Sequence, residues 1–209
     1  MPKDFSRPVF RPSETFDRLF ESEDPAEVSR AAHATATTLL ARVRSEADPD
    51  AVERLISFAA VNGIDDIAHL WSRSPAKSLP GALWRMYLIQ ASIHGDPQTS
   101  ALLYERGRVE LASTDSVVAG APVPAGPAEL VALIDTILRG AFTGDFAIAL
   151  DRAAAFCRVQ ASGSTHLADD YEGTEPERAT TLTNRASRLA AFADELATAS
   201  RLWRRGELI

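Results

Sequence analysis

The sequence predicts an all-α protein, a multi-helix bundle of about eight or nine helices with no sheet. Five times along its 209 residues an Asp, Ser or Thr stands one or two places before a proline, and a helix-like apolar pattern follows. Such a side chain accepts a hydrogen bond from the first turn of a helix, and proline suits that turn because it has no N–H to leave unpaired. The 36 alanines, together with abundant leucine, favour helix over strand.

Composition and charge narrow the class of protein. The chain is 45% hydrophobic and 24% charged, as in ordinary soluble globular proteins, and its formal net charge is −7. Nucleic-acid binders usually carry a basic face that neutralises phosphates, so the acidic average argues against nucleic acid as a partner. The chain has neither the apolar stretch of a secretory signal nor the roughly 18 apolar residues of a membrane span. We therefore expect a cytoplasmic protein without membrane contact.

The N-terminal third is expected to hold an arm and four helices. Residues 1–12 combine positive charges and prolines without periodicity, which indicates an extended arm. A single helical domain is expected over residues 13–209. Its first four helices are expected to begin at Ser13, Asp24, Asp48 and Ile64, and Gly63 ends the third of them.

The rest of the chain is expected to hold five more helices and two loops. Residues 80–93 are apolar nearly all round, which is typical of a helix buried on most sides. Small residues and prolines over 112–127 predict a flexible loop that could divide the domain, and 161–175 predicts a second, acidic loop. The five helices are expected over residues 80–93, 96–111, 130–138, 145–160 and 174–203.

The last expected helix carries a stripe of large apolar side chains that recur every seven residues. Such a stripe is typical either of a coiled-coil seam or of a long helix docked on a bundle. We take it as the candidate surface for self-association. Its members are Leu182, Leu189, Leu196 and Trp203.

Arg85 is the candidate ligand-binding residue, because it lies in the most apolar helix. A buried guanidinium stays charged and needs a carboxylate or a bound anion. The favoured interpretation is structural: either an ion pair, with Asp65 or Asp66 able to supply the carboxylate, or an arginine whose stem lies on apolar surface with its charge in water. The alternative is a small-molecule anion pocket formed by Arg85 and the aromatic side chains of Trp71, Trp84 and Tyr87.

Residues 54–73 resemble a helix-turn-helix, with a glycine turn between two expected helices. The second helix would begin with Asp65 and Asp66, whose charge repels phosphates. An ordinary helix corner is therefore the favoured interpretation, and a DNA-binding regulator is the alternative.

Residue types that carry catalysis are sparse. Cys157 lies on the apolar face of its expected helix, as a small core residue would, and a single cysteine excludes an internal disulfide. His166 with Asp169 and Asp170 supplies too few groups for a closed metal site. We therefore expect no enzyme, no catalytic residues, no metal and no cofactor.

Two segments carry a resemblance to a known family. SLPGALWRMYLIQ (78–90) and RGAFTGDFAIALDRAAAFCRVQASG (139–163) resemble a family of uncharacterised small helical proteins from GC-rich bacteria, and the resemblance extends to the final LWRRGEL. Some members are labelled RNA polymerase beta subunit, although this chain is far too short for that subunit. The resemblance implies a helical fold and carries over no activity.

The sequence thus predicts a non-enzymatic helical protein that works by binding. A protein partner or a second copy of the chain is the favoured occupant of its binding surface. A small-molecule-sensing regulator with an anion pocket at Arg85 and a DNA-binding regulator using residues 54–73 are the two alternatives.

Overall fold

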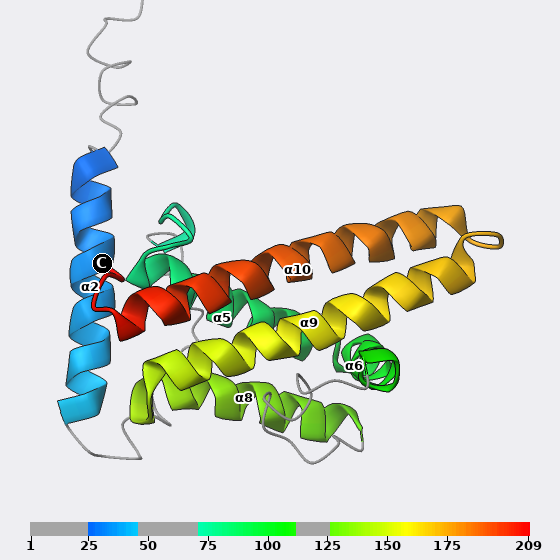
Figure 1. Ribbon diagram of the computed structural model, residues 1–209, viewed down its shortest axis with the longest axis horizontal. Coiled ribbons are helices and arrows are strands. Elements are labelled where there is room, and N and C mark those ends of the chain that lie inside the picture. The colour runs from blue at the N-terminus through cyan, green and yellow to red at the C-terminus, as the bar shows by residue number, and fades with distance from the viewer. Residues whose placement is uncertain (1–24, 46–70, 112–125) are drawn as a thin grey trace, which may run out of the picture.

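The computed structural model describes residues 25–45, 71–111 and 126–209, and every regular secondary-structure element within these ranges is a helix (Figure 1). The all-α prediction is confirmed. Six helices are described rather than eight or nine. The helices expected from Ser13, Asp48 and Ile64 lie outside the described residues, apart from Trp71. The expected arm at 1–12 and most of the expected loop at 112–127 lie outside them as well. The six are α2 (Pro25–Ser45), α5 (Leu79–Gly95), α6 (Pro97–Leu111), α8 (Pro127–Thr143), α9 (Phe146–Tyr171) and α10 (Pro176–Arg204).

The capped-proline pattern places three of the described helix starts where it predicts them, at Pro25, Leu79 and Pro97. Ser78 caps α5, since the Gly81 N–H donates to its Oγ at 3.2 Å. Asp96 accepts from the Thr99 N–H at 3.0 Å at the start of α6. A third cap, without proline, is Asp145, which accepts from the Ala147 N–H at 2.8 Å at the start of α9.

An antiparallel hairpin of α9 and α10 forms the long axis of the molecule (Figure 1). The loop expected over 161–175 is wrong, because α9 continues to Tyr171. Burial against neighbouring helices outweighs the low helix propensity of the serines and the glycine in this stretch. The cap expected at Thr174 is wrong as well, since α10 begins at Pro176 after Glu175. The buried residues that extend α9 are Ala161, Gly163, Ser164, Leu167 and Ala168.

A pair of glycines lets α6 cross α9 at close range. A Cβ atom on Gly107 would lie 1.9 Å from the Val159 carbonyl oxygen, and one on Gly163 would lie 1.8 Å from the Leu103 carbonyl oxygen. Both distances are far inside van der Waals contact, so any side chain at either position would force the helices apart. Beside this crossing, Gln160 donates to the Ser100 carbonyl at 2.8 Å, deep in the core.

At one end of the hairpin, α2 stands across the other helices (Figure 1). It packs on α5 and α8 through Ala32, Ala36 and Leu40, which are all buried. The other end of the hairpin extends away from α2, beyond the crossing with α6. Among the described helices, none has a stretch apolar enough and long enough to cross a bilayer.

Candidate functional site: an apolar groove beside α2

A groove of about 460 Å³ lies between α2, the start of α5 and the residues that follow α10. Its lining is mostly apolar, and two polar side chains from α2 contribute to it. We call it the α2 groove. Its lining residues are His33, Thr37, Leu40, Ala41, Leu79, Trp203, Leu208 and Ile209.

The α2 side of the groove is a row of residues four apart. His33, Thr37 and Ala41 follow one another along one face of the helix, because a spacing of four residues returns nearly to the same side. Leu40 lies beside this row and is only 4% exposed, so it also belongs to the core. The His33 ring is held against its own helix, where Nδ1 lies 2.7 Å from the Ser29 carbonyl oxygen.

The opposite side of the groove depends on a sharp turn at the end of α10. Gly206 has a φ of 69°, the left-handed region that glycine enters without a steric penalty. The Gly206 N–H donates to the Trp203 carbonyl at 3.0 Å, and the Glu207 N–H donates to the Leu202 carbonyl at 2.9 Å. These two bonds form a Schellman motif, which ends the helix and reverses the chain. Leu208 is thereby placed in the core at 7% exposure.

A backbone hydrogen bond joins this turn to the start of α5. The Leu79 N–H donates to the Ile209 carbonyl oxygen at 3.1 Å. The first N–H groups of a helix have no partner within the helix, so this bond satisfies one of them. It also holds Leu79 and Ile209 side by side in the groove wall, while the Ile209 side chain stays exposed.

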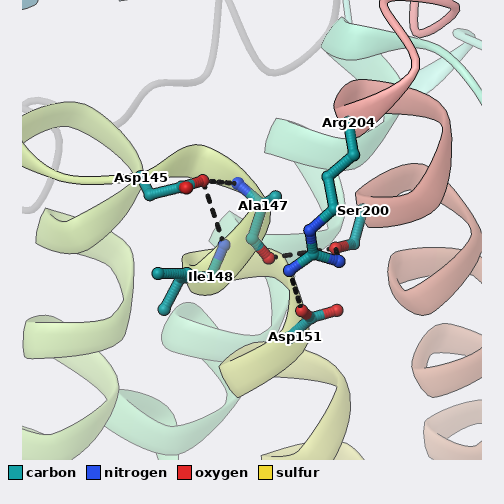
Figure 2. Close-up of polar contacts among 6 residues, drawn as sticks. All are labelled: Asp145, Ala147, Ile148, Asp151, Ser200 and Arg204. Atoms are coloured by element: carbon teal, nitrogen blue, oxygen red, sulfur yellow. Dashed lines mark hydrogen bonds and ion pairs between the residues drawn. The ribbon is translucent and has the colours of Figure 1, made fainter.

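Polar contacts join the start of α9 to the end of α10 (Figure 2). Arg204 forms an ion pair with Asp151 and donates to Ser200 Oγ at 2.8 Å, and Ser200 Oγ donates to the Ala147 carbonyl at 3.1 Å. The hydrogen bond with Asp151 raises the pKa of the Arg204 guanidinium. Next to them the Trp203 ring meets Phe146 edge to face, with ring centroids 4.9 Å apart. The start of α9 therefore fixes the tryptophan that lines the groove.

Arg85 is occupied by partners within the chain. Its guanidinium forms an ion pair with Glu195 of α10 and donates to the Gly81 carbonyl at 2.9 Å. It also lies 5.7 Å from the centre of the Phe192 ring. The carboxylate comes from α10, whereas Asp65 and Asp66, which the sequence suggested for this role, lie outside the described residues.

The aromatic residues predicted around Arg85 belong to two different places. Trp84 and Tyr87 stack on each other, with centroids 5.7 Å apart. Trp71 is buried, and its Nε1–H donates to Thr35 Oγ1 of α2 at 3.1 Å. Arg85 is thus tied to α10 and Trp71 to α2. The anion pocket that would unite the four residues stays a prediction.

The apolar stripe of α10 packs against other helices of the chain. Leu196 is fully buried in the main core, and Leu182 belongs to a smaller cluster that also contains Leu103 and Leu167. Leu189 and Trp203 are partly buried and pack on the main core. The stripe therefore supplies packing within the chain in this structure, and its use for self-association stays a prediction.

The remaining predicted sites fall on separate surfaces or outside the described residues. His166 lies on α9, 3.9 Å from Glu110, while Asp170 forms an ion pair with Arg106. Within the described part of the chain, no group of three or more His, Cys, Asp or Glu residues is placed to hold a metal ion. The helix-turn-helix candidate at 54–73 lies outside the described residues apart from 71–73.

Cys157 is fully buried in α9, and burial raises the pKa of its thiol well above the ordinary value. The nucleophilic form of cysteine is the thiolate. Because the folded protein holds this side chain as an uncharged thiol inside the core, Cys157 acts as a packing residue.

The α2 groove was not predicted from the sequence, although the sequence contains one signal for it. Arg204 and Arg205 in front of Gly206 match the basic last turn and glycine that end many helices. Two apolar residues, Leu208 and Ile209, follow that glycine and indicate a chain that turns back onto the core.

Comparison with known proteins finds no matching family model, no matching curated protein and no matching solved structure. The resemblance to the helical family of GC-rich bacteria stays a prediction.

Proposed function

We propose that this protein works by binding, and that the α2 groove receives a small apolar or amphipathic molecule. The observation that carries the proposal is the groove itself, about 460 Å³ in volume and lined mostly by apolar side chains. Ligand pockets typically measure about 300–1,000 Å³ and are apolar with a few polar groups.

Removal of apolar surface from water favours binding in the groove. Each buried methylene contributes about 0.8 kcal/mol, so an alkyl chain of eight carbons gains several kcal/mol from Trp203, Leu208 and their neighbours. Association and ordering oppose this gain. We expect a dissociation constant between about 10 μM and 1 mM for such a probe.

The site at Arg85 is the weaker candidate for a ligand. Its positive charge already faces the Glu195 carboxylate, and an added anion would have to displace that partner. Four predictions from the sequence remain proposals: a protein partner, self-association, DNA binding through residues 54–73 and a cytoplasmic location.

The test is the binding of octanol, measured by isothermal titration calorimetry on the full chain. Ala41→Phe places a bulky ring in the groove and is expected to weaken binding at least tenfold. Ala191→Phe is the matched control, because Ala191 is exposed on α10 and does not line the groove. Octanol that fails to bind, or that binds both variants equally, would contradict the proposal.

A further inference from the structure

We infer that His33 selects the head group of the ligand in the α2 groove, and that this head group donates a hydrogen bond, as in an unbranched primary alcohol. The inference rests on the proposed function, since it concerns the chemistry of a ligand in the same groove. The source of specificity is the Nε2 atom of His33.

The first step is the position of the proton on the His33 ring. Its Nδ1 atom lies 2.7 Å from the Ser29 carbonyl oxygen. A carbonyl oxygen can only accept, so Nδ1 must carry the hydrogen in this contact. A neutral imidazole has one N–H, and the Nε2 atom of the neutral ring is therefore an acceptor.

The second step is the accessibility of that acceptor. His33 lines the groove and is only partly buried, and Nε2 is the ring nitrogen farther from the helix backbone. Within the described residues, its Nε2 atom makes no hydrogen bond. A ligand in the groove therefore meets a lone pair at His33, the hydroxyl of Thr37 and apolar side chains elsewhere.

Thr37 is the other polar residue that lines the groove. Thr37 has a hydroxyl, which both donates and accepts, so it does not distinguish one head group from another. His33 does, because an alcohol or a primary amide can donate to Nε2, whereas an ether or a carboxylate presents only lone pairs to it. An alkyl chain on the apolar wall with a donating head at His33 satisfies both parts of the groove.

The test compares octanol with heptyl methyl ether, its isomer, which has the same atoms but no O–H. Both affinities are measured by calorimetry at about pH 8.5, where imidazole is neutral. For the unaltered protein we expect octanol to bind about three- to tenfold more tightly than the ether. His33→Phe, which has no acceptor, is expected to bring this ratio close to one, and His33→Gln, which keeps an acceptor, to preserve a preference.

The ratio of the two affinities within each variant cancels any general effect of the substitution on the groove. Equal binding of alcohol and ether by the unaltered protein would overturn the role of His33 and leave the groove intact as a binding site. A preference for octanol that persists in His33→Phe would overturn it as well. If neither isomer binds, the proposed function fails together with the inference.

Discussion

At the scale of single residues, polar side chains fix several helix ends in the described part of the chain. Ser78 illustrates this role, since its Oγ accepts from the Gly81 N–H and donates to the Pro75 carbonyl at 2.7 Å. The residue types that begin helices were readable from the sequence, because a cap and its helix are neighbours in the chain. The partner of Arg85 was not, because Glu195 is distant in sequence and only the fold brings it close.

We predict that Ser78→Ala lowers the free energy of unfolding by about 1 kcal/mol, because the first turn of α5 loses its side-chain acceptor. Urea denaturation followed by circular dichroism measures the change. Ser78→Thr keeps a hydroxyl that can both accept from Gly81 and donate to Pro75, and is expected to lose less. An alanine variant as stable as the original protein would show that the cap contributes nothing.

The Cys157 thiol is predicted to be unreactive in the folded protein, because it is fully buried and burial raises its pKa. Ellman's reagent is expected to label it at the rate of unfolding, and rapidly in strong denaturant. Prompt, complete labelling of the native protein would contradict this placement.

At the scale of elements, the most extensive packing is within the α9–α10 hairpin, and α6 crosses it through two glycines. The length of α9 could not be predicted correctly, because Gly163, Ser162 and Ser164 locally favour a loop. In the structure Gly163 is where the backbone of α6 comes closest, so the same residue that suggested a loop permits the helix crossing. Such a role depends on a helix far away in sequence.

Gly163→Ala is predicted to destabilise the protein by about 2–3 kcal/mol, because its Cβ would lie 1.8 Å from the Leu103 carbonyl oxygen and push α6 away. Gly173→Ala is the matched control, since a Cβ there meets nothing within 4 Å. Both are measured as free energies of unfolding in urea. If the two substitutions have the same effect, the close crossing of α6 and α9 is not present in solution.

At the scale of the whole molecule, the α2 groove exists only because distant parts of the chain meet. Its wall combines His33 from the first described helix with Leu208 and Ile209 from the last residues of the chain. The all-α fold class, several helix starts and the burial of α5 could be predicted, because each depends on the spacing of residues that are neighbours in the sequence. The groove could not, because no pattern within one helix reports which helices become neighbours.

Occupation of this groove by an alkyl chain can be measured through the quenching of tryptophan fluorescence by bromooctanol. Bromine quenches an indole that it touches, and of the three tryptophans only Trp203 lines the groove. We predict saturable quenching that Trp203→Phe removes, that Ala41→Phe abolishes and that Ala191→Phe leaves unchanged. Quenching that is linear in probe concentration, or that survives in Trp203→Phe, would show that the alkyl chain does not bind in the α2 groove.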